Sequence, residues 1–100
     1  MAAARAAGRL DLKITTLGLG QPAAVALAKK ELIVGTATIA PYDQAIAEAN
    51  LGAAAVLGKT GLPGFVASEV LPTYHSNVLE AWKYSYGVDA PQPVASVWVK

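Results

Sequence analysis

Strand-type and helix-type patterns alternate along this chain, and glycine and proline stand where one gives way to the other. Residues 10–17 alternate apolar and polar side chains, which is typical of a half-buried strand. Pro22 suits the first turn of a helix that continues through residues 23–28. Residues 32–40 are rich in β-branched side chains and almost continuously apolar, as in a strand covered on both faces. The sequence therefore predicts that the chain opens with a strand, a helix and a second strand.

A second and longer helix is expected over residues 43–57. Asp43 can cap its first turn, Gly58 can end it, and its apolar positions recur at helical spacing. These positions are Ile46, Ala49, Ala53, Val56 and Leu57, and the small side chains of the two alanines allow close approach to another surface. We therefore expect this helix to pack flat on the sheet.

Three short elements are expected in the last part of the chain. Residues 65–71 are typical of a strand, which Pro72 ends. Residues 78–82 supply one apolar face of a short helix that Ser76 could cap. Residues 94–99 are apolar at nearly every position and predict a terminal strand. Such a strand must pair with another strand, in this chain or in a partner.

These elements follow one another in a βαβαβ-type order, with a short helix and the C-terminal strand after it. Helices that alternate with strands predict an α/β fold, here an α+β sandwich in which helices pack on a small sheet. We expect a flexible N-terminus over residues 1–9 and a single α/β domain over residues 10–84. Residues 85–100 are expected to form a linker and a terminal strand that pairs with a partner.

The surface of such a domain would carry unusually few charges. Only 15% of the residues are charged, against about a quarter in an ordinary soluble domain, and 54% are hydrophobic. A folded chain of this length covers only part of its apolar surface by itself. We therefore expect protein partners, either copies of this chain or other subunits of a large complex. The formal net charge of +1 gives no electrostatic reason to expect nucleic acid, and the longest uncharged run, residues 14–28, is too polar to predict a transmembrane helix.

Two glycine motifs invite comparison with nucleotide-binding loops. Residues 18–23 match G-x-G-x-x-A between a predicted strand and a predicted helix, where backbone amides could hold a pyrophosphate. The next strand lacks the acidic residue that would bind the ribose, and a tight turn explains the glycines equally well. Gly58, Lys59 and Thr60 resemble the end of a phosphate loop, but Ala53 stands where that loop needs glycine. No cofactor is therefore expected.

No constellation of side chains predicts catalysis or metal binding. The chain has no cysteine, which excludes disulfides and thiolate chemistry and leaves the redox compartment open. His75 is the only histidine, and no second ligand stands at a metal-binding spacing from it. Ser68 and Ser76 lack the glycine setting of a nucleophile elbow. We therefore expect that the protein is not an enzyme.

Aromatic side chains gather near the C-terminus, namely Tyr74, Trp82, Tyr84, Tyr86 and Trp98. Ordinary core packing is one explanation for them. The other is a patch that faces a partner, because tyrosine and tryptophan are enriched at protein interfaces. Tyr84, Tyr86 and Trp98 are accordingly candidate interface residues.

Several segments resemble the bacterial microcompartment shell domain. Residues 36–43 resemble its third strand and the start of its second helix, and residues 66–80 resemble a strand that ends in a proline and a histidine before a short helix. Residues 14–19 and 24–29 are similar to its first strand and first helix. Residues 85–99 resemble the linker and opening strand between the repeats of two-domain, trimer-forming shell proteins.

This resemblance implies a structural tile with Lys29 at its edge and His75 nearby. One departure from the family is clear, because residues 31–38 are too short to hold the hairpin and loop that line the family's central pore. No pore residue is therefore carried over.

Two functions stay open at this point. The first is a structural, self-assembling subunit that resembles a microcompartment shell tile, which implies a cytoplasmic location. The second is a small non-catalytic accessory subunit of a large, possibly membrane-associated, complex, held by its aromatic C-terminal region. An organellar location would follow if residues 1–9, which contain arginine and no acid, are the remnant of a transit peptide.

Overall fold

The predicted strand–helix–strand unit is present in the computed structural model, which describes residues 1–100. Strands β1 (Ile14–Leu17) and β2 (Ile33–Thr38) are parallel neighbours, and helix α2 (Gln21–Ala28) connects them. Gly18 makes the turn out of β1 with a φ of 83°, a conformation that favours glycine. Gly20 is the N-cap of α2, and Pro22 lies in its first turn as expected.

The sheet has only one further strand, β3 (Leu71–Thr73), which pairs antiparallel with β2 to give the order β1-β2-β3. The expected strand over residues 65–71 is wrong, because residues 59–70 have no regular structure and Phe65 is 82% exposed. Pro72 lies within β3 instead of ending a strand before it. A proline is compatible with this place because β3 is an edge strand, on which one row of backbone N–H groups needs no partner.

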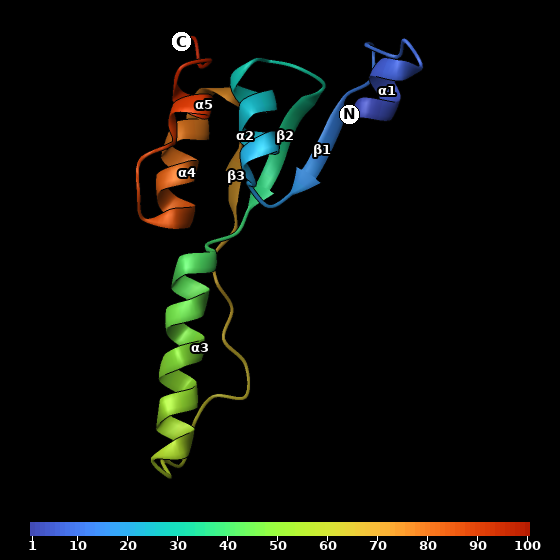
Figure 1. The fold of residues 1–100 in the computed structure, drawn as a ribbon. Coiled ribbons are helices and arrows are strands. Elements are labelled where there is room, and N and C mark those ends of the chain that lie inside the picture. Colours follow the sequence, from blue (N-terminus) through green and yellow to red (C-terminus); the bar gives the residue numbers. More distant parts are fainter.

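Helix α3 (Pro41–Val56) does not pack on the sheet, contrary to the expectation from its alanines. None of its 16 residues is buried, and the helix projects away from the rest of the molecule (Figure 1). Residues 39 and 40 separate β2 from α3, and the chain does not turn back over the sheet there (Figure 1). Asp43 lies in the first turn without capping it, whereas Gly58 follows the helix end with a φ of 67°, as predicted.

The C-terminal part is helical where we expected a linker and a strand. A 3-10 turn, η1 (His75–Asn77), leads into α4 (Val78–Tyr86), and α5 (Gln92–Ala95) follows. The N-cap residue of α4 is Asn77, so Ser76 does not cap it as proposed. Pro93 lies in the first turn of α5, which its fixed φ favours and which explains why the expected strand over residues 94–99 does not form.

One hydrophobic core joins the two ends of the chain. Leu27 from α2, Val78 from α4 and Val94 from α5 are its largest fully buried apolar side chains, and Ile33 of β2 packs with them. Below this core, the hydroxyl groups of Thr38 and Thr73 form a buried hydrogen bond of 2.7 Å between β2 and β3. The terminal segment thus belongs to this chain's own core, so pairing of a terminal strand with a partner is not supported.

The N-terminal residues, expected to be flexible, contain the helix α1 (Ala2–Ala6). Alanine has the highest helix propensity, which explains a helix without buried residues. Arg5 of α1 forms an ion pair with Glu31, and Arg9 forms one of 2.8 Å with Asp11. Five helices and a three-stranded mixed sheet confirm the predicted α+β class.

The molecule has two parts, which we call the body and the arm. The arm consists of residues 41–70, that is α3 and the segment that returns from its end, and the body is everything else (Figure 1). The arm leaves the sheet beyond Thr38 and comes back at Leu71, and these two residues are register partners in the sheet. It gives the molecule a length of 57 Å against 26 and 18 Å in the other directions.

Candidate interaction site

Two of the candidate interface residues, His75 and Trp98, contact each other in the body. Their rings stack with centroids 6.1 Å apart, and the indole N–H of Trp98 donates to the carbonyl oxygen of His75 at 2.8 Å. Nδ1 of His75 lies 2.9 Å from the carbonyl oxygen of Leu27, and Nε2 lies 2.7 Å from that of Val99. His75 therefore links the C-terminal segment to the end of α2 through its two ring nitrogens.

Tyr84 and Tyr86 also form hydrogen bonds to backbone groups of this chain. The Tyr86 hydroxyl donates to the carbonyl oxygen of Leu19 at 2.8 Å, and its ring lies against that of Trp82 with centroids 4.6 Å apart. The Tyr84 hydroxyl donates to the carbonyl oxygen of Glu69 at 3.3 Å. These contacts favour intramolecular packing of the aromatic cluster, and a partner contact through its half-exposed side chains stays a prediction.

Lys29 follows Leu27, the contact of His75 in α2, by two residues, so His75 lies at the same end of α2 as Lys29. Lys29 is the C-cap residue of α2 and is exposed. It lines a shallow depression together with Arg5 and Glu31. The structure therefore brings His75 and Trp98 together, and leaves Lys29 as the one exposed member of the set.

Backbone groups of the glycine turn after β1 already form hydrogen bonds within the chain. The backbone N–H of Gly18 donates to the carbonyl oxygen of Ala37 in the sheet at 2.8 Å. The carbonyl oxygen of Leu19 accepts a hydrogen bond from the Tyr86 hydroxyl. These contacts favour the interpretation of residues 18–23 as a tight structural turn. No cluster of three histidine, aspartate or glutamate side chains is placed to hold a metal ion, and no helix is long and apolar enough to cross a membrane.

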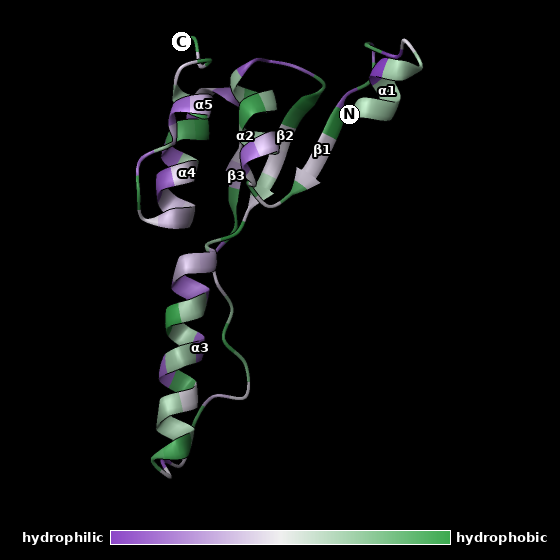
Figure 2. Ribbon diagram, viewed as in Figure 1, coloured by the Kyte–Doolittle hydropathy of each residue, from purple (hydrophilic) through white to green (hydrophobic).

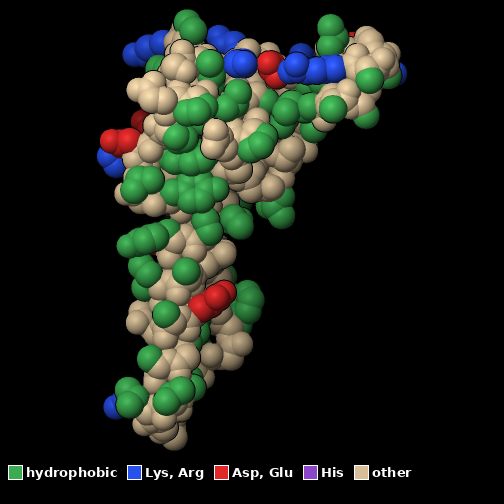
Figure 3. Space-filling view, viewed as in Figure 1, with side chains coloured by type: hydrophobic (Ala, Val, Ile, Leu, Met, Phe, Trp, Pro, Cys, Tyr) green, Lys and Arg blue, Asp and Glu red, His purple; other side chains and the backbone are tan.

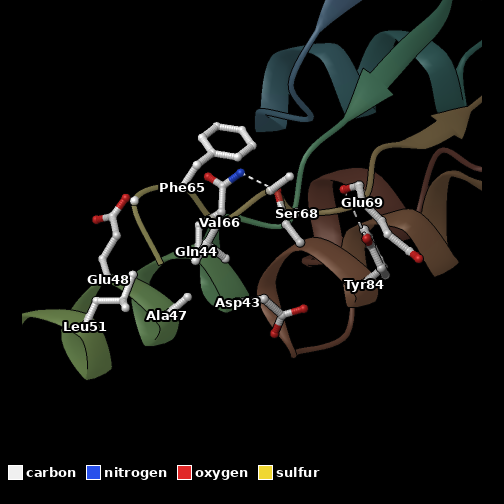
Figure 4. A pocket seen from close by; sticks show the side chains of 13 residues that line it. Asp43, Gln44, Ala47, Glu48, Leu51, Phe65, Val66, Ser68, Glu69 and Tyr84 are labelled. Atoms are coloured by element: carbon white, nitrogen blue, oxygen red, sulfur yellow. Dashed lines mark hydrogen bonds between the residues drawn. The ribbon is translucent and has the colours of Figure 1, made fainter. Parts of the chain in front are cut away.

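The largest hollow lies in the arm, between α3 and the return segment (Figure 4). It is an open groove of about 730 Å³, closed at its body end by Tyr84. The Gln44 carboxamide donates to the Ser68 hydroxyl at 2.5 Å across it, and Glu48, Leu51 and Phe65 lie further out. The return segment is thus attached to one face of α3 by few contacts.

The opposite face of α3 is largely exposed, and the Tyr42 ring at its body end lies near Gly87. It carries an apolar row that we call the seam, made of Tyr42, Ile46, Ala49, Ala53 and Val56. Tyr42 is 56% exposed, Ile46 46% and Val56 89%. Because their spacing alternates between four and three residues, all five members fall on one side of the helix. Hydrophobic residues recur along the arm in Figure 2, and the space-filling view shows apolar side chains on it with few charged ones between them (Figure 3).

Sequence reasoning missed the seam as a site although its signal was visible. The helical spacing of Ile46, Ala49, Ala53 and Val56 was assigned to contact with the sheet, because the same spacing serves a core face and a partner face equally. A scan against protein-family models and a search of curated proteins return no match for this chain.

Proposed function

We propose that this chain is a structural subunit that assembles with copies of itself through its arm. The observation that carries the proposal is α3, a helix of 16 residues without a single buried one. Most helices in proteins owe their stability to an apolar face packed on something else. The seam gives α3 such a face, and most of it is left exposed by the rest of the chain.

The surface area of the chain supports the same proposal. Its accessible surface is 6573 Å², whereas a compact monomer of 10.2 kDa exposes about 5,300 Å². The excess of roughly 1,200 Å² is more than the ~800 Å² that each partner contributes to a standard stable interface. Association through the arm would bring the exposed area back to an ordinary value.

The arm is also poor in charge. It has four charged side chains in 30 residues, Asp43, Glu48, Lys59 and Glu69, and none of them belongs to the seam. Charged residues are depleted at the centre of protein interfaces because their desolvation is costly. An apolar, uncharged face of this kind fits a protein partner.

A shell-tile role remains part of this proposal through the sequence resemblance alone. Only the single strand β2 lies between α2 and α3, so the pore hairpin of the family has no counterpart, and no transport role is proposed. The alternative of an accessory subunit is less favoured, since the C-terminal aromatic residues that would anchor it form hydrogen bonds within the chain. In that case too, the arm would be the contact surface.

Sedimentation equilibrium of the purified full chain tests the proposal. We expect a concentration-dependent mass at multiples of 10.2 kDa between about 1 and 100 μM, the range of a moderate-affinity self-association. Val56→Lys should raise the dissociation constant at least tenfold, whereas Val99→Lys, a matched change at an exposed valine of the body, should not. A wild-type chain that is monomeric at 100 μM would refute the proposal.

A further inference from the structure

We infer that the seam of α3 pairs with the seam of a second copy, antiparallel, about a two-fold axis at Ala49. This inference rests on the proposed function and specifies the surface and the symmetry through which assembly begins. The occupant is a second copy, because the seam is complementary to itself in a way described next.

The spacing of the seam is that of a helix-pairing surface. Positions 42, 46, 49, 53 and 56 follow the alternating steps of four and three residues that place side chains at the contact between two packed helices. Ala49 and Ala53 stand at its centre, and alanines allow two helix axes to approach to about 8 Å. The larger side chains, Tyr42 and Val56, stand at its ends.

An antiparallel pair sets Ile46 of one copy against small side chains of the other. With the axis at Ala49, Ile46 of each copy lies at the level of Gly52, next to Ala53, in the other copy, and Tyr42 lies opposite Val56. The Ile46 side chain then fills the space that Ala53 leaves, which is the large-to-small alternation of a well-packed interface. A parallel pair would instead set Ile46 against Ile46 and Ala53 against Ala53, so that no large side chain faces a small one.

The shape of the molecule also favours the antiparallel pair. The body lies at the N-terminal end of α3 (Figure 1). Antiparallel arms hold the two bodies at opposite ends of the pair, whereas parallel arms would bring both bodies to the same end. The antiparallel pair further brings Lys59, the only basic residue of the arm, towards the end at which Asp43 of the other copy lies. A contact in which each copy offers the same surface closes as a dimer.

Disulfide trapping tests this arrangement directly, because the chain has no cysteine of its own. A disulfide needs Cα atoms within about 7 Å, so only residues that meet across the axis can be linked. Under mild oxidation with copper phenanthroline, Ala49→Cys should form at least ten times more covalent dimer than Glu48→Cys, the adjacent exposed residue off the seam. In a mixture, Ile46→Cys and Ala53→Cys should link to each other several times more than either links to itself.

The outcomes separate the two proposals. If the wild-type chain associates in sedimentation but Ala49→Cys is linked no more than Glu48→Cys, the seam inference is wrong and the proposed function stands. If Ile46→Cys links mainly to itself, the helices pair in parallel and the inference is overturned. If the wild-type chain is monomeric at 100 μM, both proposals fail together.

Discussion

Replacing Val94 by alanine should destabilise the body strongly, because this side chain is fully buried between α5 and the rest of the core. The change removes the equivalent of two methylene groups, which accounts for about 1.6 kcal/mol at ~0.8 kcal/mol each. The cavity left behind, roughly 50 Å³, adds about 1 kcal/mol. We therefore expect a loss of about 2 to 3 kcal/mol in the free energy of unfolding.

Thermal unfolding followed by circular dichroism measures this loss. In a chain of 100 residues it corresponds to a fall of about 10 to 20 °C in the melting temperature. Val99→Ala is the matched control, since it deletes the same atoms from a side chain that is 71% exposed and should change stability by less than about 0.5 kcal/mol. Equal melting temperatures for the two variants would refute the placement of the terminal segment in the core.

Two smaller predictions concern single polar contacts. Thr73→Val leaves the buried Thr38 hydroxyl without its partner and should lower the free energy of unfolding by about 1 to 3 kcal/mol. The double variant Thr73→Val with Thr38→Val should lower it by less than the single change, because no unpaired hydroxyl is left. Urea unfolding measures both values. The hydrogen bonds from the Arg9 guanidinium hold the pKa of the Asp11 carboxyl below its ordinary value. Arg9→Ala should therefore raise the pKa of Asp11 in an NMR titration, and the small stability that this pair contributes should be present near neutral pH and fade as the pH falls through that pKa.

Local patterns predicted the first half of the body well. The alternation in β1, the glycines after it and Pro22 together determine a strand, a tight turn and a helix, since each of these signals acts over a few residues. Gly58 likewise identified the end of α3, because a residue with positive φ after a helix is usually glycine.

The errors arose where distant contacts decide the structure. Val94 is buried in the core beside α2, which lies far from it in the sequence, and this contact favours helix over the strand that its apolar neighbours suggested. The aromatic residues were recognised as a group, but their hydrogen bonds to Leu19, Glu69 and the His75 carbonyl depend on the fold. No local sequence pattern distinguishes an aromatic side chain that packs within its own chain from one that contacts a partner.

The most consequential wrong prediction was that α3 packs on the sheet. A row of apolar residues at helical spacing shows that a helix has one face to bury, but not whether a sheet or another chain buries it. In this chain α3 runs away from the sheet after β2, and the apolar row by itself does not encode that direction (Figure 1).

Hydrogen–deuterium exchange of α3 at different protein concentrations tests the central claim most directly. A helix without buried residues opens readily, so its amides should exchange fast in dilute solution and become protected when a second copy covers the seam. We predict that protection of residues 41–56 rises at least tenfold between about 1 and 100 μM protein, while that of residues 21–28 in α2 stays constant. Equal protection of α3 at both concentrations would contradict assembly through the arm.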